Sequence, residues 1–187
     1  METPPHPHRW RIFGLCWITY AALYLGRVNF AVALPAIQTE FGWDKAAVGL
    51  IGGALYWSYA LGQLINGNLG DRASARAFVG LGLFASALLN ALFGLQGGMA
   101  GMALVWALNG WAQSTGWGPL VKTLSRWFDP QRRGLIAALF GPCYVVGHAL
   151  SWVLAGWLIS RWDWRVAFWG PAVILAAFGT LWILAMR

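Results

Sequence analysis

The stretch IFGLCWITYAALYLGRVNFAVALPAI, residues 12–37, decides the fold of this chain. It is long and apolar enough to cross a bilayer, which takes roughly 17 to 25 residues of helix. Its one charged residue, Arg27, lies 17 residues from Trp10 and 16 from Trp43, which flank the stretch as interfacial aromatic residues do. Those separations are about 24 Å of helix, too far for an arginine side chain to reach either membrane surface. A charge at that depth costs about 2.5 to 3.5 kcal/mol on insertion scales and indicates a functional site.

Two interpretations of Arg27 are open at this depth. It could be a structural arginine that pairs with a buried carboxylate or with backbone carbonyl groups, or it could bind an anionic ligand. No Asp or Glu occurs within the core of any apolar stretch, which argues against a buried ion pair. The sequence therefore favours an anion as the partner of Arg27.

The composition is that of an integral membrane protein. Of 187 residues, 59% are hydrophobic and 10% are charged, a profile that a soluble domain could not keep in solution. The net charge of +7 does not indicate nucleic acid, because the basic residues lie in short segments between apolar stretches, where topology signals lie. Cys16 and Cys143 both lie within apolar stretches, so neither a disulfide framework nor a metal site is expected, and no cofactor is predicted.

Six apolar stretches predict an all-α membrane domain that occupies residues 1–187. The first stretch is too long for a cleavable signal peptide and carries Arg27. Nine of the 13 basic residues lie on the same side of the predicted bundle as the N-terminus and three on the other, so we expect a multi-pass protein with both ends of the chain in the cytoplasm. After a tail of residues 1–11, the predicted spans lie near residues 12–37, 46–70, 77–95, 99–121, 135–159 and 166–186.

Two turns indicate an internal repeat. Leu69-Gly-Asp-Arg72-Ala-Ser-Ala-Arg76 after the second span and Leu158-Ile-Ser-Arg161-Trp-Asp-Trp-Arg165 after the fifth both have arginines three and seven residues after a leucine. The turns lie on opposite membrane faces, as expected of a 3+3 inverted repeat, the pattern found in each half of many secondary transporters. In the fourth span, Gly116-Trp-Gly-Pro119 predicts a kink, because proline lacks a backbone donor.

Polar side chains recur at helical spacing on four spans, which places those of each span on one face of its helix. Tyrosine and glutamine can donate hydrogen bonds to an oxyanion, although ordinary packing is the alternative for any single tyrosine. His148 is a candidate proton carrier, with a buried, hydrogen-bonded histidine as the alternative. The four faces carry Tyr20, Tyr24 and Arg27; Tyr56, Tyr59 and Gln63; Asn109, Gln113 and Trp117; and Tyr144 and His148.

Several of these motifs resemble a known transporter family. Gly67-Asn-Leu-Gly-Asp71-Arg72, with Arg76 after it, resembles the cytoplasmic loop signature of the major facilitator superfamily, in which Asp71 and the arginines can form a network that latches one conformation. Further motifs resemble the organophosphate:phosphate antiporter family, which includes bacterial glycerol-3-phosphate and hexose-phosphate transporters. These are Tyr20-Ala-Ala-Leu-Tyr-Leu-Gly-Arg27-Val-Asn29, Gly110-Trp-Ala-Gln113-Ser-Thr-Gly-Trp117-Gly-Pro119, Lys122 with Trp127-Phe128, and Arg133-Gly134.

The resemblance covers essentially the whole chain and implies roles for its polar residues. Arg27 corresponds to the phosphate-binding arginine of the first helix. Gln63 stands where these transporters often carry a lysine, and Tyr144 stands where glycerol-3-phosphate members place a histidine, so the site is less cationic and its substrate is left open. Asp71, Arg72 and Arg76 would help to gate the cytoplasmic side. The further cavity-lining positions are Tyr20, Tyr24, Tyr59, Gln113 and Trp117.

The resemblance also implies an architecture and a function. Members have twelve helices in two halves, so this chain would be the N-terminal half, from a partial sequence or as one half of a dimer, in a bacterial inner membrane. The implied function is alternating-access transport of small organic anions, with organophosphate exchanged for phosphate. Anion:cation symporters, which share an Arg-x-Asn element but carry an acidic residue at the position of Gly26, and sugar-phosphate sensors are the alternatives. No paired carboxylates, Ser-His arrangement or metal-ligand cluster is evident, so an enzyme is not expected.

Overall fold

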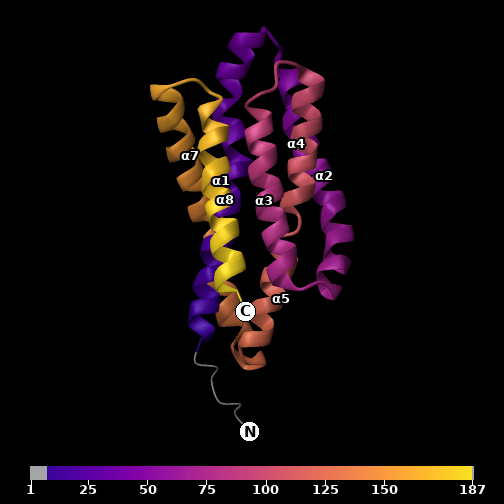
Figure 1. Cartoon of the computed structure of the whole chain (residues 1–187), viewed down its shortest axis with the longest axis vertical. Helices are drawn as coiled ribbons and strands as arrows, with labels where there is room; N and C mark the ends of the chain where they lie inside the picture. Colours follow the sequence, from indigo (N-terminus) through magenta and orange to yellow (C-terminus); the bar gives the residue numbers. More distant parts are fainter. Residues whose placement is uncertain (1–7, 187) are drawn as a thin grey trace.

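The computed structural model describes residues 8–186, and its helices run along one long axis (Figure 1). Residues 1–7 of the predicted tail and Arg187 lie outside the described residues. Between residues 8 and 186 no strand occurs, so the predicted all-α fold is confirmed. The elements are α1 (Arg9–Phe41), α2 (Lys45–Arg72), α3 (Ala75–Phe93), α4 (Met99–Gln113), α5 (Trp117–Trp127), η1 (Pro130–Arg132), α6 (Arg133–Phe140), α7 (Pro142–Arg161) and α8 (Val166–Ala185).

The ends of the first three helices follow from local sequence. Gly42 ends α1 with a left-handed φ of 65°, which glycine adopts at no steric cost, and its N–H donates to the carbonyl of Gln38 at 3.0 Å. The side chain of Asp44 accepts a hydrogen bond from the N–H of Ala47 and so caps α2. Ser74 caps α3 in the same way through the N–H of Ala77. Helix α1 therefore runs for 33 residues, past both ends of the apolar stretch.

Within residues 8–186, five helical segments are long and apolar enough to cross a membrane: α1, α2, α3, the run from η1 to α7, and α8. The region of the fourth predicted span is divided into α4, with 15 residues, and α5, with 11. The break at residues 114–116 lies where the sequence predicts a kink. Pro119 falls in the first turn of α5, where a missing backbone donor costs nothing.

The helix contacts follow an internal two-fold pattern. The most extensive packing joins α2 to α4 and α1 to α7, followed by α3 to α8. If the first, second and third spans are exchanged with the fourth, fifth and sixth, the α2–α4 contact, between spans two and four, becomes the α7–α1 contact, between spans five and one. The α3–α8 contact, between spans three and six, is unchanged by the exchange. The predicted 3+3 repeat is therefore present in the packing of the helices. The first described turn of α1 and the last turn of α8 lie at the same end of the bundle (Figure 1).

A layer of buried polar side chains separates two apolar clusters. One cluster surrounds Tyr20, Leu83 and Leu120, and the other surrounds Phe30 and Trp106. Between them, at the depth of Gly26 in α1, lie five polar side chains that are 0% exposed. We call these side chains the polar layer: Asn29, Ser86, Asn90, Asn109 and Gln113.

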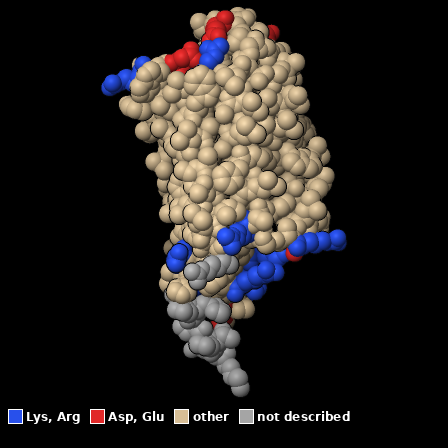
Figure 2. Space-filling model, in the orientation of Figure 1, with Lys and Arg blue, Asp and Glu red and all other residues tan. Residues whose placement is uncertain are grey.

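Charged side chains gather at the two ends of the molecule and leave a wide uncharged belt between them (Figure 2). The belt exposes large apolar side chains such as Trp57 and Leu64 on α2 and Val153 on α7, as a surface in contact with lipid does. The chain is a multi-pass membrane protein. The end at which α1 begins and α2 and α5 finish, here called the basic end, carries Arg9, Arg11, Arg72, Arg76, Lys122, Arg126, Arg132 and Arg133.

Candidate anion-binding site

Helix α1 is interrupted one residue before Arg27. Gly26 has φ −96° and ψ 16°, outside the helical range. Its carbonyl oxygen accepts hydrogen bonds from three side-chain amides: Asn90 Nδ2 at 3.1 Å, Asn109 Nδ2 at 2.8 Å and Gln113 Nε2 at 3.0 Å. A Cβ atom on residue 26 would lie 2.6 Å from Leu175 Cδ1 and 2.7 Å from Asn90 Nδ2. Glycine therefore allows these side chains to reach the backbone of α1.

Arg27 is buried, and its charge is not neutralised within residues 8–186. The side chain is 8% exposed, and no ion pair of the described residues includes it. Its Nε donates to Gln113 Oε1 at 2.7 Å, while Nη2 is buried without a hydrogen-bond partner among the described residues. A buried, unpaired donor costs about 1 to 3 kcal/mol, and more when it is charged. The geometry thus disfavours the carboxylate-paired alternative and leaves one donor of the guanidinium without a partner among residues 8–186.

Two tyrosine rings flank this guanidinium. The Cζ atom of Arg27 lies 4.7 Å from the ring centroid of Tyr24 and 4.5 Å from that of Tyr59. Both distances are within the range of a cation–π interaction, which stabilises a cation withdrawn from water. Gln63 Nε2 donates to the hydroxyl of Tyr59 at 2.7 Å, so Gln63 orients that hydroxyl group. The faces of α1 and α2 predicted from the spacing do meet at Arg27.

The other predicted site residues extend outward from Tyr24. Its ring centroid lies 5.6 Å from that of Tyr20, 6.4 Å from that of Tyr144 and 4.9 Å from that of His148. The ring of Trp117 lies 4.9 Å from the ring of Tyr20. Aromatic contacts therefore join side chains of α1, α5 and α7. Tyr144 and His148 are exposed on α7, whereas Tyr20 is buried.

Gln113 lies behind Arg27, which differs from the cavity-lining position that the resemblance implies. Its side chain is 0% exposed. Its Nε2 donates to the carbonyls of Leu23 and Gly26 and to Ser86 Oγ, each at 3.0 Å, and its oxygen accepts from Arg27. These bonds engage both the NH2 group and the oxygen of the Gln113 amide. Gln113 can therefore affect a ligand only through Arg27.

Ser86 and Asn90 were not among the residues singled out from the sequence, and Asn29 was named only as part of a motif, although all three complete the polar layer. Asn29 Nδ2 donates to Asn90 Oδ1 and to the carbonyl of Ala167, both at 2.9 Å, and Ser86 Oγ donates to Asn109 Oδ1 at 2.7 Å. A signal was present, since Ser86 and Asn90 are four residues apart in an apolar span and so share a helix face.

The network around Asp71 uses a different cation from those expected. Asp71 Oδ1 lies 2.8 Å from Lys122 Nζ, and Lys122 also donates to the carbonyls of Asp71 at 2.7 Å and Gly70 at 3.5 Å. No ion pair joins Asp71 to Arg72 or Arg76 in the part of the chain that the structure describes. The reason is position: α5 packs against the last turn of α2, so Lys122 reaches the helix terminus, where a cation interacts favourably with the free carbonyl groups.

This geometry predicts unequal effects of removing the two partners. Lys122→Met is expected to lower the free energy of unfolding by about 0.5 to 1 kcal/mol, because the carbonyls of Gly70 and Asp71 at the end of α2 lose the cation that bonds them. Asp71→Asn is expected to have a smaller effect, because Lys122 keeps its bonds to the two carbonyls. Thermal unfolding of the purified protein in detergent measures both, with Arg132→Met in η1, at the same end of the bundle, as the basic control. An Asp71→Asn loss as large as that of Lys122→Met would contradict the assignment.

A second charged cluster fastens the opposite end of the bundle. Glu40, near the end of α1, accepts hydrogen bonds from Trp164 Nε1 at 2.6 Å and from Arg165 Nη1 at 3.0 Å. Arg165 also contacts Asp163 at 3.2 Å. The hydrogen bond to Glu40 is the main cause that raises the pKa of Arg165 above its ordinary value. The cluster joins α1 to the turn between α7 and α8.

Among the described residues no group of three or more His, Cys, Asp or Glu could hold a metal ion.

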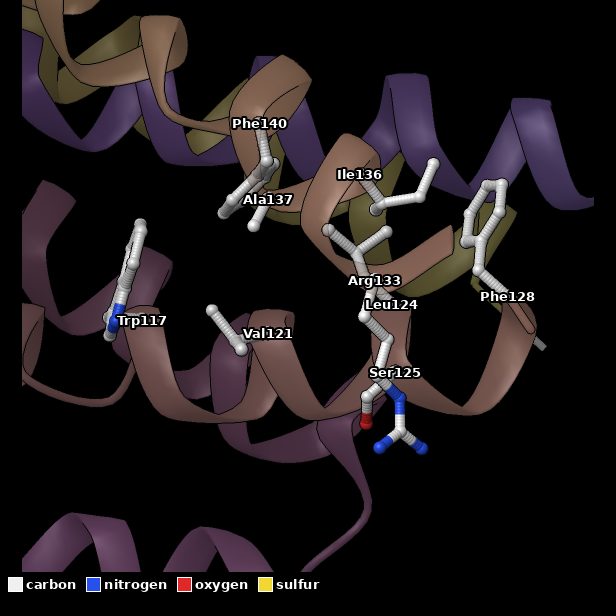
Figure 3. Close-up of a pocket in the computed structure, with 9 residues that line it drawn as sticks. All are labelled: Trp117, Val121, Leu124, Ser125, Phe128, Arg133, Ile136, Ala137 and Phe140. Carbon is white, nitrogen blue, oxygen red and sulfur yellow. The ribbon is translucent and has the colours of Figure 1, made fainter. Parts of the chain in front are cut away.

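A cavity of about 240 Å³ lies between α5 and α6, away from Arg27 (Figure 3). Trp117 lies at one end of the cavity and Phe128 at the other, and Arg133 and Ser125 are the polar residues of its lining. Trp117 also contacts Tyr20, so the apolar end of the cavity adjoins the aromatic residues beside Tyr24. The cavity itself is too apolar to be the anion site.

The sequence profile of the Major Facilitator Superfamily matches residues 16–187. The chain belongs to the Major Facilitator Superfamily. The match includes Gly26 and Arg27, all five side chains of the polar layer, and the α2–α3 turn with Asp71. The site described above is therefore part of a Major Facilitator Superfamily domain.

Curated members of the superfamily are similar to this chain over nearly all of its length. A probable hexose phosphate transport protein of Chlamydia pneumoniae is 34% identical over 179 residues, which are 96% of this chain and 39% of that protein. The glycerol-3-phosphate transporter of Bacillus subtilis is 32% identical over 184 residues, 96% of this chain and 41% of that protein. The membrane sensor protein UhpC of Salmonella typhimurium is 31% identical over 180 residues, which are 95% of this chain and 40% of that protein. The chain thus spans about two fifths of the length of these relatives.

The fold is also that of a solved Major Facilitator Superfamily structure. The crystal structure of a bacterial homologue of the human lysosomal transporter Spinster, inward-facing and unoccupied, superposes with a TM-score of 0.85 at 17% identity. The match covers 97% of this chain and 43% of that one. At this identity the likeness concerns the fold alone. The helices described here correspond to one half of the superfamily fold.

Proposed function

We propose that this protein is a secondary active transporter of small organic anions, and that it exchanges an organophosphate for inorganic phosphate by alternating access. The observation that carries the proposal is Arg27, a cation inside the membrane domain with no carboxylate partner among residues 8–186 and with Nη2 unbonded. A hexose phosphate and glycerol 3-phosphate, named for two relatives, have different organic parts and share the phosphate ester. A guanidinium can bind this shared group through two parallel, charge-assisted hydrogen bonds.

In this proposal the phosphate group binds to the distal nitrogens of Arg27 between the rings of Tyr24 and Tyr59. The planar guanidinium presents its donors as a fork that matches two phosphate oxygens. The hydroxyl of Tyr59, oriented by Gln63, supplies a further donor. Tyr20, Trp117 and Tyr144 extend the same aromatic surface toward the organic part of the substrate, and His148 is a candidate for proton coupling in a symporter.

The basic end is proposed to face the cytoplasm of a bacterial cell, with both ends of the chain on that side. The excess of Lys and Arg at that end follows the positive-inside rule (Figure 2). The contact of Asp71 with Lys122, together with Arg72 and Arg76, would then take part in cytoplasmic gating. A second six-helix half, or a dimer mate, would cover the face that carries Tyr59 and Tyr144 and add a second cation to the site.

The test is uptake of a labelled hexose phosphate or glycerol phosphate into proteoliposomes that contain the purified full-length protein. Uptake that requires inorganic phosphate inside the vesicles supports exchange. Uptake of carboxylates driven by a proton gradient, without a requirement for internal phosphate, would favour the anion:cation symporter alternative. Liposomes without protein and the Arg27→Ala variant are the controls.

A membrane sensor is the second candidate function, because a membrane sensor protein is 31% identical over 95% of this chain. A sensor needs the same anion site but no complete transport cycle. Binding of the labelled phosphate ester in detergent, without flux in the proteoliposomes, would favour this function over transport. If the protein shows no binding and no flux, the result would contradict both candidate functions.

A further inference from the structure

We propose that the polar layer is a positioning device: Asn90, Asn109 and Gln113 hold the interruption of α1 at Gly26 and thereby place the guanidinium of Arg27. The inference rests on the proposed function of Arg27 as the anion ligand. It assigns positioning roles to Asn90, which was not singled out from the sequence, and to Asn109, which the spacing places only on a polar face of its span.

The first step of the argument is the number of donors on one carbonyl group. A backbone carbonyl within a helix normally accepts one bond from the fourth following residue. The carbonyl of Gly26 accepts three side-chain N–H bonds, two from α4 and one from α3, at 2.8 to 3.1 Å. Buried amides must be hydrogen-bonded to avoid a large desolvation cost, and here three of them share one backbone acceptor. This carbonyl is the point at which α1 is fixed against α3 and α4.

The second step is the direct link from that carbonyl to the charge. Gln113 donates to Gly26 O through Nε2 and accepts from Arg27 Nε through Oε1. The same side chain therefore fixes both the backbone next to Arg27 and the near nitrogen of its guanidinium. With Nε held by Gln113 and the faces held by Tyr24 and Tyr59, the unbonded Nη2 has a defined position.

The third step is the rigidity of the layer itself. Asn109 also accepts from Ser86 Oγ, and Asn90 also accepts from Asn29, whose Nδ2 reaches the carbonyl of Ala167. The layer thereby joins α1, α3, α4 and the start of α8. A binding group must be held within roughly 0.5 Å of its productive position, and supporting hydrogen bonds of this kind are what provide that precision. A loosened layer would leave Arg27 present but misplaced.

The test is a double-mutant cycle on the purified full-length protein with inorganic phosphate as the probe. Asn109→Leu removes the donor to Gly26 in a side chain of similar size, and is expected to weaken phosphate binding about tenfold, the equivalent of about 1.4 kcal/mol. In an Arg27→Lys background the same change should alter the Kd by less than about twofold, because residues that act through one another are not additive. Equal losses in both backgrounds, or an unchanged Kd in the first, would overturn the proposal.

Asn66→Leu is the matched control. Asn66 of α2 is also a buried amide, and its Nδ2 donates to Ser114 Oγ at 2.7 Å and to the carbonyl of Trp111 in α4 at 3.4 Å. Among the described residues it has no hydrogen bond to the polar layer. Its loss should lower the thermal midpoint and leave phosphate binding within about twofold of the unmodified protein. Gly26→Ala is the second variant in case Asn109→Leu does not fold. Its Cβ meets only the ends of the Leu175 and Asn90 side chains, which can shift, and the same pattern of binding losses is expected.

A ligand-free measurement separates this inference from the proposed function. The rate at which phenylglyoxal modifies Arg27, measured by mass spectrometry of the peptide that contains it, is expected to rise severalfold in Asn109→Leu and not in Asn66→Leu. If the unmodified protein binds no phosphate compound, the proposed function fails, while the modification rate still tests positioning. An unchanged rate in Asn109→Leu overturns the positioning role whether or not phosphate binds.

Discussion

Arg27→Lys is expected to weaken the binding of inorganic phosphate or a hexose phosphate by about tenfold or more, and Arg27→Ala by about 100-fold. Lysine keeps the positive charge but has no nitrogen in the position of Nε, so the bond to Gln113 is lost. It also lacks the planar face that contacts Tyr24 and Tyr59. Equilibrium binding of labelled phosphate to the purified protein in detergent measures the effect.

The matched control for this prediction is Arg165→Lys at the opposite end of the bundle. Arg165 already has carboxylate partners in Glu40 and Asp163, so its replacement should leave phosphate binding within about twofold. If Arg27→Lys binds phosphate as the unmodified protein does, Arg27 is a structural residue and the anion site lies elsewhere.

Gly110→Ala is expected to give the largest loss of stability, about 1 to 3 kcal/mol, because an added methyl group overpacks a close helix contact. A Cβ atom on Gly110 would overlap the carbonyl oxygen of Leu55 and the hydroxyl of Ser58, and would lie 2.9 Å from the carbonyl carbon of Leu55. The obstacle is backbone, which cannot move aside as a flexible side chain can. Helices α2 and α4, which have the most extensive contact in the bundle, would have to separate.

Gly53→Ala is the control for the same helix pair. A Cβ atom on Gly53 in α2 would meet nothing within 4 Å, so alanine should be neutral or stabilising by roughly 0.5 to 1 kcal/mol through its higher helix propensity. Thermal unfolding in detergent compares the two variants. Equal stability of Gly110→Ala and Gly53→Ala would mean that α2 and α4 can shift apart without cost.

The family and the all-α fold could be predicted from the sequence because both depend on local features. Apolar stretches of spanning length, and the loop from Gly67 to Arg76, do not need the fold to be recognised. The partner of Asp71 could not be predicted in this way. Arg72 and Arg76 are close to Asp71 along the chain, but Lys122, 51 residues away, reaches it because α5 packs beside the end of α2.

The candidate site also has features that the sequence could predict and features that it could not. The spacing of Tyr20, Tyr24 and Arg27 defines one face of α1 whatever surrounds it, since helical geometry repeats every 3.6 residues. The spacing of Asn109 and Gln113 likewise placed both on one face of α4, but it could not tell whether that face lines a cavity or packs behind another helix. The structure places it behind α1, where Gln113 has no exposed surface.

The sequence by itself therefore determined that Arg27 is a charge inside a membrane helix with no nearby carboxylate in its own stretch, because depth and composition are properties of the chain. Tertiary structure decided what holds that charge. Three amides from two other helices meet at the carbonyl of Gly26, and Tyr59 of α2 meets the guanidinium, across separations in sequence that no local pattern reports. Hydrogen bonds and ring contacts depend on distances of a few ångströms, and only the packing of the helices sets them.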